Sequence, residues 1–152
     1  MHALIENPDE FAKLRGDPGL VNAAVEEVVR WATPVNYMRR RAACDTEMGG
    51  RRIRKDDWLI LFYASGNRDE DVFDDPFRFR VDRAPNPHVG FGYGEHFCLG
   101  SHLARRSQRA LFAELARRLE HVELAGEPEW IKSSFVVGLK HLPIRYRIAR
   151  GA

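Results

Sequence analysis

The sequence predicts an α+β fold that is mainly helical. Three observations lead to this prediction: helical spacing of apolar residues in the first 33 positions, short extended runs between residues 35 and 62, and a long amphipathic segment after Cys98. The 152 residues are 44% hydrophobic and 30% charged, which is ordinary for one globular domain with a sizeable core. We therefore expect residues 1–152 to form part of a single domain, without repeats or linkers.

The first predicted helix covers residues 7–16. Asn7 can cap it, Pro8 suits the first helical position, and Glu10 stands where a capping box closes. Gly16 ends the pattern, and a second helix runs from Leu20 to the break at residues 33–34.

Short extended runs follow, at residues 36–43, 51–53 and 58–62, separated by turn residues. They predict a small β-sheet. Residues 65–97 show little periodicity, and a loop of this length inside a compact domain is usually functional.

A long amphipathic helix is predicted directly after Cys98. Its expected apolar stripe consists of Leu103, Ser107, Leu111, Leu115 and Leu119. The tail, residues 131–137 and 144–148 around Gly138 and Pro143, is typical of a β-hairpin.

Overall composition excludes several classes of protein. The net charge of +2 favours neither nucleic-acid binding nor attachment to a membrane. The longest apolar run, residues 58–64, is far shorter than the roughly 20 residues that span a bilayer. The first residues lack the pattern of a secretory signal, so we expect a cytoplasmic protein. Two cysteines do not make a disulfide framework, and Cys44 is expected to be a buried or half-buried thiol.

Residues 91–100 carry the most chemical information. Cys98 ends a glycine-rich loop and precedes a helix, where backbone N–H groups and the helix dipole favour a thiolate. Gly92, Gly94 and Gly100 permit tight turns and let a flat ligand approach the backbone. Thiolate ligation of haem iron suits such a loop.

The spacing of Phe91, Gly94, His96, Cys98 and Gly100 resembles the haem-binding loop of bacterial cytochromes P450. The resemblance implies haem b as cofactor, with Cys98 as the iron ligand and metal-binding residue. It also implies that Phe91 packs near the sulfur and that His96 binds a haem propionate. The further haem contacts that it implies are Gly92, Gly100 and Ala104.

A second resemblance lies in the helix of residues 20–33. Glu27 and Arg30 match the family's Glu-x-x-Arg motif, and Arg83 stands where the family places their second arginine. The resemblance implies a buried structural network. Taken alone, a Glu and an Arg at this spacing more often form a solvated surface pair.

The residues after Pro34 resemble the family's substrate-contacting turn. This implies substrate contacts for Val35, Asn36, Tyr37 and Met38, and a propionate contact for Arg39, which is chosen over its two arginine neighbours only by its distance from the Glu-x-x-Arg motif. In the tail, the resemblance implies substrate contacts for Val136 and Val137.

Residues 67–77 and 85–88 are similar to the family's meander, so the resemblance extends from Asn7 to Ile148. It implies that residues 1–152 are the C-terminal haem-binding part of a monooxygenase whose N-terminal part is missing. Such an enzyme inserts one oxygen atom of O2 into an apolar substrate, for which sterols, terpenoids and fatty acids are the expected classes. Because the missing part includes the helix over the distal haem face, we expect this chain alone to be inactive.

A ferredoxin-type or other redox partner is expected to dock on the face of Arg105, Arg106 and Arg109, although such a cluster equally fits a solvated helix face. Three alternatives stay open from the residues alone. The chain could be a non-catalytic haem-binding or metal-binding fragment. A Cys/His metal site could form from Cys98 and His96 with the histidines at 88 and 102, although the spacing is not that of a zinc finger. A cysteine hydrolase could use His96 or His141 as its base.

Overall fold

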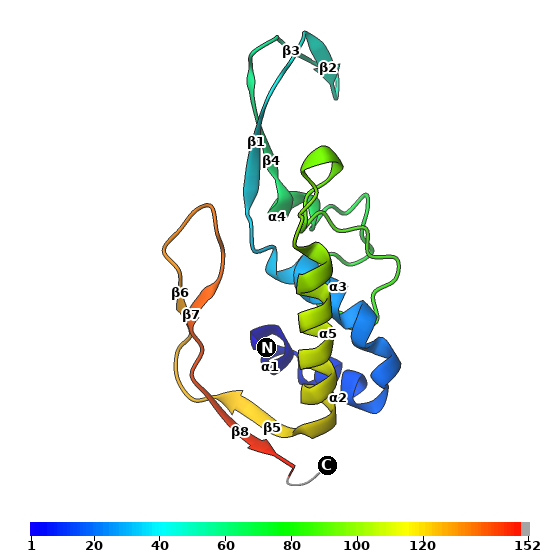
Figure 1. Ribbon diagram of the computed structural model, residues 1–152, viewed down its shortest axis with the longest axis vertical. Helices are drawn as coiled ribbons and strands as arrows, with labels where there is room; N and C mark the ends of the chain where they lie inside the picture. Colours follow the sequence, from blue (N-terminus) through cyan, green and yellow to red (C-terminus); the bar gives the residue numbers. More distant parts are fainter. Residues whose placement is uncertain (150–152) are drawn as a thin grey trace.

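The computed structural model describes residues 1–149 and shows an elongated molecule that mixes helices with small antiparallel ribbons (Figure 1). The helices are α1 (His2–Glu6), α2 (Pro8–Gly16), α3 (Val21–Ala32), α4 (Tyr63–Gly66) and α5 (Ser101–Arg118), with single 3-10 turns η1 (Pro18–Leu20) and η2 (Gly94–His96). The strands are β1 (Tyr37–Arg41), β2 (Thr46–Met48), β3 (Arg51–Ile53), β4 (Trp58–Phe62), β5 (Leu119–Leu124), β6 (Glu129–Trp130), β7 (Leu139–His141) and β8 (Ile144–Ile148). The predicted α+β class is confirmed.

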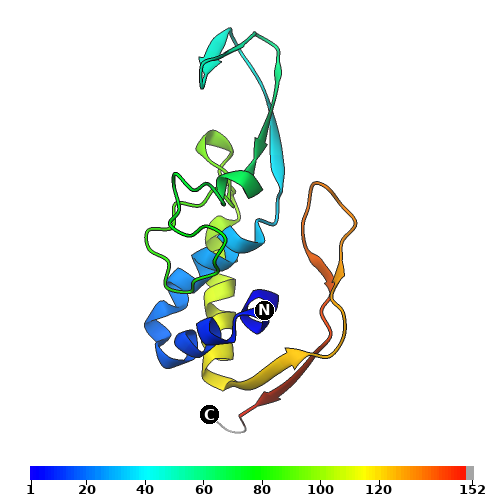
Figure 2. The same ribbon diagram turned by 180° about the vertical axis from the view of Figure 1, so that it is seen from behind.

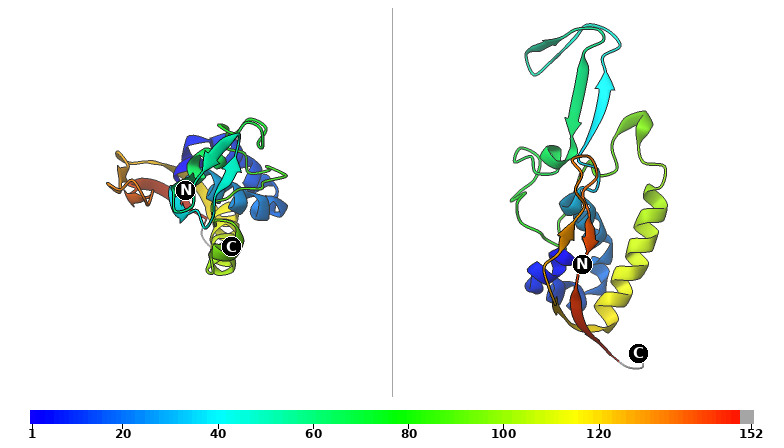
Figure 3. Two further views of the ribbon diagram at one scale, coloured as in Figure 1. Left: turned by 90° about the horizontal axis from the view of Figure 1, so that it is seen from above. Right: turned by 90° about the vertical axis from the view of Figure 1, so that its left-hand side faces the viewer.

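The core lies where α2, α3 and α5 pack together, with α3 and α5 side by side in the middle of the molecule (Figures 1 and 3). Leu14, Val25 and Val81 are fully buried there, and Phe112 joins them from α5. The predicted stripe on α5 is wrong over its first half, because Leu103 is 70% and Leu111 is 54% exposed. Phe112 and Ala116 are the residues of α5 that are buried in the core, and Leu115 packs against it.

The N-terminal elements differ from the predicted capping pattern. A short helix, α1, precedes α2, and the side-chain amide of Asn7 donates to the carbonyl of Ala3 at 2.8 Å instead of capping α2. Glu10 does not close a capping box either. Its buried carboxylate accepts the N–H of Val81 at 2.8 Å, and so ties α2 to the long loop.

The predicted small sheet is present as two ribbons. β1 pairs with β4 from Tyr37 opposite Phe62 to Arg41 opposite Trp58, and β2 pairs with β3 beyond them. The resulting arm projects from the helices (Figure 1). Because alternate side chains of β1 point to opposite faces, neighbouring residues of this strand meet different surroundings.

The tail forms two ribbons rather than the predicted hairpin. β8 pairs with β5, and β6 pairs with β7, so residues 131–137 connect strands instead of forming one. The prediction failed because Leu119 continues the leucine spacing of α5, which hid the start of β5. An isolated bridge between Val35 and Val136 holds the connecting segment against the start of β1.

Residues 67–93 form the long irregular loop that the sequence predicts, and this loop lies across α3 (Figure 2). Asn67 fixes it at one end. Its amide nitrogen donates to the hydroxyl of Thr33 at 2.9 Å, and its amide oxygen accepts the N–H of Val89 at 2.8 Å. The Asn67 side chain therefore joins the end of α3 to the last part of the loop, which precedes Cys98.

Candidate functional site

Cys98 sits on a tight loop that ends at α5. The N–H of Cys98 donates to the carbonyl of Phe91 at 2.9 Å, and the carbonyl of Cys98 accepts the N–H of Ser101 at 3.1 Å, where α5 begins. Gly92 adopts φ 76°, and a Cβ there would lie 3.2 Å from the hydroxyl oxygen of Tyr63. The loop thus needs glycine at this point both for its backbone angle and for close packing on α4.

The Cys98 thiol is exposed and opens on a hollow of about 520 Å³. We call this the Cys98 hollow. Three segments of the chain contribute its walls, namely the loop before α5, the start of β1 and α4. Its walls are Pro34, Val35, Met38, Arg40, Tyr63, Gly90, Phe91, Gly92, His96 and Cys98.

The hollow contains Arg40 and not Arg39. Met38 and Arg40 share the face of β1 that lines the hollow, whereas the guanidinium carbon of Arg39 lies 4.0 Å from the ring centroid of Trp58. The prediction for Arg39 is corrected accordingly, because a shift of one residue along a strand turns the side chain to the opposite face. Within residues 1–149, Arg40 forms no ion pair, and its guanidinium donates to the carbonyl of Arg39 at 3.0 Å.

The expected substrate residues divide into three groups. Val35 and Met38 line the Cys98 hollow. Asn36 and Tyr37 connect elements, since the amide of Asn36 donates to the carbonyl of residue 134 at 3.2 Å and the Tyr37 ring packs 5.6 Å from that of Phe135.

The remaining two expected substrate residues lie in the tail. Val136 stands opposite Val35 in the isolated bridge. Val137 lines a separate hollow of about 280 Å³ with Met1 and Trp130. The structure therefore does not bring Val137 to the Cys98 hollow.

Gly100 and Ala104 follow the cysteine. A Cβ at Gly100 would lie 3.9 Å from the Cys98 sulfur, and Ala104 is half-buried on the first turn of α5. His96 lines the hollow from η2 and forms no ion pair within the described residues. Cys44 is exposed on the arm, so the expectation that it is buried is wrong, because the arm projects beyond the core.

Glu27, Arg30 and Arg83 meet in one buried network, as the family resemblance implies. These three residues are 0%, 0% and 4% exposed, in that order. The carboxylate of Glu27 accepts two hydrogen bonds of 2.7 Å from Arg30 and two of 3.2 and 3.1 Å from Arg83. The two guanidinium groups also donate to carbonyls of the long loop, at Asn67, Asp74, Asp75, Pro76 and Arg78. The network thus ties α3 to the loop, and the surface-pair alternative is wrong.

A second carboxylate beside this network is one that the sequence did not reveal. Glu26 accepts hydrogen bonds from Arg105 on α5 at 2.7 and 2.8 Å, and it lies 3.0 Å from the Nε2 atom of His88. Burial raises the pKa of Glu26, but the bonds from Arg105 and His88 outweigh it and leave that pKa lowered. Burial lowers the pKa of His88. The hydrogen bond to Glu26 raises the pKa of Arg105.

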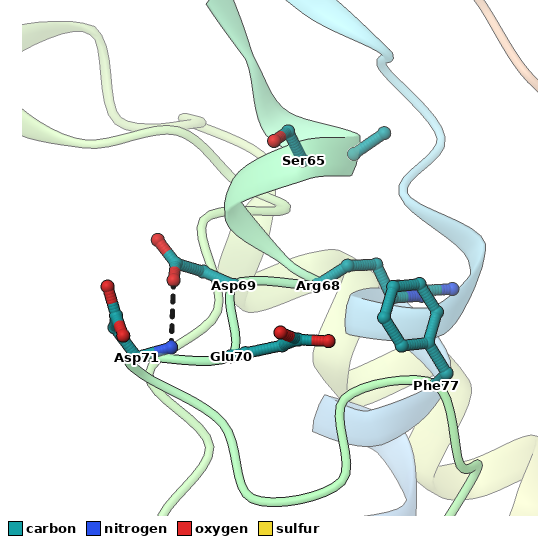
Figure 4. A pocket seen from close by; sticks show the side chains of 7 residues that line it. Ser65, Arg68, Asp69, Glu70, Asp71 and Phe77 are labelled. Carbon is teal, nitrogen blue, oxygen red and sulfur yellow. Dashed lines mark hydrogen bonds between the residues drawn. The ribbon is translucent and has the colours of Figure 1, made fainter.

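A third hollow, of about 620 Å³, lies on the long loop away from Cys98 (Figure 4). Its walls carry the acidic residues 69–71 together with Arg68 and Phe77. Arg68 is already bound, because it donates to the carbonyl of Trp31 at 2.9 Å and stacks 4.5 Å from that ring. The side chain of Asp69 accepts the N–H of Asp71 at 3.0 Å. These contacts order the loop.

The alternative of a Cys/His metal site gains no support. Within the described residues, no group of three or more His, Cys, Asp and Glu lies together in a way that could hold a metal ion. His88 is directed to Glu26, and His102 is exposed. No helix in the same part of the chain is long and apolar enough to cross a bilayer.

Comparison with known proteins gives the class. The family model described as Cytochrome P450 matches residues 13–148. Cytochrome P450-terp of a Pseudomonas species is 45% identical over 94% of this chain and 33% of its own length. Linalool 8-monooxygenase of Pseudomonas putida is 47% identical over 93% of this chain and 35% of its own length. The solved structure of Cytochrome P450-153 from Novosphingobium aromaticivorans is 40% identical, with a TM-score of 0.90 over 96% of this chain and 37% of that one.

The chain belongs to the cytochrome P450 family, and it spans about a third of the length of these relatives. Proteins of this family bind haem b through a cysteine thiolate. The residues present fit that group: a thiol opens on a hollow with largely apolar walls, and Arg40 and His96 are donors on the same hollow without a carboxylate partner among residues 1–149.

Proposed function

We propose that the chain is the C-terminal haem-binding part of a cytochrome P450 monooxygenase, with the Cys98 thiolate as iron ligand. One observation carries the proposal. The cysteine of the haem-loop motif shares one hollow with apolar side chains from β1 and the residues just before it. The same hollow holds two hydrogen-bond donors, the guanidinium of Arg40 and the imidazole of His96. A planar apolar group with two carboxylates requires this combination of walls.

Different side chains around the hollow would bind different parts of the haem. Arg40 presents a planar guanidinium that can form two parallel hydrogen bonds with one propionate, and His96 can donate to the other. Gly92 is part of the wall of the hollow, and Gly100 leaves the backbone uncovered beside the sulfur. Phe91 lines the hollow together with Cys98 and would shield one side of the sulfur from water once haem covers the hollow.

When bound, thiolate-ligated haem supplies oxygen activation, because the sulfur pushes electron density that favours O–O cleavage. The parent enzyme would insert one oxygen atom of O2 into an apolar substrate, with electrons from NAD(P)H. Val35 and Met38 are the substrate-facing walls that this chain contributes. Relatives are named Linalool 8-monooxygenase, Methyl-branched lipid omega-hydroxylase and Steroid C26-monooxygenase, which favours a terpenoid, fatty acid or sterol.

A ferredoxin-type redox partner would meet the exposed guanidinium groups on α5. Arg106 and Arg109 are exposed, and Arg109 lies 4.0 Å from Glu26, whereas Arg105 is held by Glu26 through two short hydrogen bonds. We therefore assign the docking charge to Arg106 and Arg109, which speed encounter with an acidic partner.

The test compares two cysteine variants of the haem-reconstituted chain. Cys98→Ala should abolish the ferrous-CO absorption band that is typical of thiolate ligation, and Cys44→Ser should leave it intact, because Cys44 lies on the projecting arm. Equal loss in both variants, or a band that survives Cys98→Ala, would disprove the ligand assignment. Bound zinc in place of haem would favour the metal-binding alternative.

We expect no coupled turnover by residues 1–152 alone. Oxygen insertion requires a closed, dry pocket that positions the substrate, and Cys98 is exposed in this chain. Product formed per NAD(P)H consumed, with a redox partner and a panel of sterols, terpenoids and fatty acids, measures this directly. Coupled product formation would contradict the expectation.

A further inference from the structure

Glu26, His88 and Arg105 form a hydrogen-bonded chain that lies outside the Cys98 hollow. Glu26 comes from α3, Arg105 from α5 and His88 from the long loop, so three separate parts of the molecule meet at one carboxylate. The side chains of Glu26 and Arg105 are 23% and 22% exposed, and that of His88 is 3% exposed. The bidentate geometry of the Arg105 contact fixes the plane of its guanidinium.

The protonation pattern of His88 supports this arrangement. Its Nδ1 atom accepts the N–H of Gly90 at 3.1 Å, so Nε2 carries the proton and donates to Glu26. The ring is therefore neutral and fixed at both nitrogens. The charged groups of the cluster are then the carboxylate of Glu26 and two cations of α5, Arg105 at 2.7 Å and Arg109 at 4.0 Å.

The chain of contacts ends on Phe91. The guanidinium carbon of Arg105 lies 4.5 Å from the centroid of the Phe91 ring, and the His88 ring centroid lies 5.9 Å from it. The carbonyl of Phe91 accepts the N–H of Cys98. Phe91 is thus held on one side by groups that Glu26 fixes, and it is joined to the cysteine by the backbone.

We infer that Glu26 is a positioning residue, which holds Arg105 against Phe91 and so fixes the Phe91 ring and a nearby cation beside the Cys98 thiolate. The inference rests on the proposed haem site for its electronic consequence but not for its geometry. Without Glu26, Arg105 would extend into solvent, because its side chain is already 22% exposed and loses the one bidentate partner that it has among residues 1–149. The positive charge near the thiolate would then be weakened by solvent screening.

Two readouts test this. The first uses the haem-free chain labelled with 4-fluorophenylalanine at its nine phenylalanines, with the Phe91 signal assigned by Phe91→Leu. Glu26→Ala and Arg105→Ala should each shift or broaden the fluorine signal of Phe91, and the double variant should add nothing further. The other fluorine signals should stay in place, which also shows that the variants are folded.

The second readout is the haem reduction potential of the reconstituted chain, measured by a mediated spectroscopic titration. Arg105→Ala should lower it, because a cation near the site favours the reduced form. Glu26→Ala should lower it too, although simple removal of a negative charge would raise it. The sign for Glu26→Ala therefore separates positioning from plain electrostatics, and a non-additive double variant shows that both act through one contact.

The ion pair of Glu114 and Arg117, 2.7 Å apart on the same helix, provides the matched control. Glu114→Ala and Arg117→Ala remove the same charges and should leave the Phe91 signal and the potential unchanged. An unmoved Phe91 signal, or a potential raised by Glu26→Ala, overturns the inference. If wild type shows no thiolate-type haem spectrum, the proposed function fails, and the fluorine readout still decides the inference.

Discussion

The buried network around Glu27 and the Cys98 hollow differ in whether their polar groups have partners. In the network, the carboxylate of Glu27 accepts from Arg30, Arg83 and neighbouring loop groups, and the residues are almost fully buried. In the hollow, the thiol of Cys98 is exposed and Arg40 has no ion-pair partner among the described residues. The two regions are connected by the same long loop.

This difference distinguishes residues that stabilise the fold from residues that are available to bind a ligand. A buried charge is tolerated only when its partners are complete, so a satisfied network indicates structure. Donors that lack partners, on a hollow with apolar walls, indicate binding. The neighbours Glu26 and Glu27 both have partners, but they point in different directions from one turn of α3: Glu27 faces the loop network, while Glu26 reaches α5 and the segment before Cys98.

The largest effect is expected from Glu27→Ala. The variant leaves Arg30 and Arg83 buried without their carboxylate, which costs about 3–5 kcal/mol of unfolding free energy. Urea denaturation of the haem-free chain measures it. Glu114→Ala, a change at an exposed ion pair on α5, should lower that free energy by less than about 1 kcal/mol. A similar urea midpoint for both variants would remove the distinction between the network and the surface.

The sequence predicted the helices α2, α3 and α5, the β1–β4 arm and the loop around Cys98, because periodicity, turn residues and a dense motif are local signals. It could not predict which arginine enters the hollow. Arg39 and Arg40 differ by one position, and the strand's pairing with β4 decides which face each takes. The prediction for Leu103 and Leu111 failed for a similar reason. Periodicity shows which residues share one face of a helix, but it does not show which face packs against another element.

Glu26 was missed because its partners, His88 and Arg105, lie 62 and 79 residues away in the chain. The positions of Glu26, His88 and Arg105 in the sequence give no indication that their side chains are in contact. A carboxylate next to the Glu-x-x-Arg motif was visible, but its direction follows only from the packing of α3 on α5. Contacts that link distant segments are the part of the site for which the fold is needed.

A smaller effect separates the two neighbouring arginines. Arg40→Ala should weaken haem binding by about 1.5–3 kcal/mol, because it removes a charged hydrogen-bond donor from the hollow. That is roughly a ten- to hundredfold fall in affinity. Arg39→Ala should leave haem affinity unchanged and lose only its contact with Trp58, worth about 0.5–1 kcal/mol of stability. Haem titration of the two variants side by side decides this, and a greater loss with Arg39→Ala would restore the assignment made from the sequence.

The smallest effect concerns His88. This residue is buried and hydrogen-bonded like the Glu27 network, although it lies close to the segment that carries Cys98. Burial lowers its pKa from the usual 6.5, while the unfolded chain titrates near that value. Between those two pKa values the unfolded state binds more protons, so the free energy of unfolding should fall as the pH drops below about 6.5. The slope is at most about 1.4 kcal/mol for each pH unit of that window.

His88→Gln should flatten this pH dependence, because a glutamine amide can donate to Glu26 and accept from Gly90 without titrating. The carboxyl of Glu26 does not confuse the result, since its pKa is lowered from 4.5 and its stabilising contribution is lost only at lower pH. Urea denaturation of both proteins at a series of pH values from 7.5 to the onset of acid unfolding measures the difference. His121→Gln, at an exposed histidine of β5 that lies 3.4 Å from Glu123, serves as the control for a histidine outside the Glu26 cluster. Parallel curves for wild type and His88→Gln would mean that His88 ionises in the folded chain as freely as in the unfolded one, and that the Glu26 cluster is open to water.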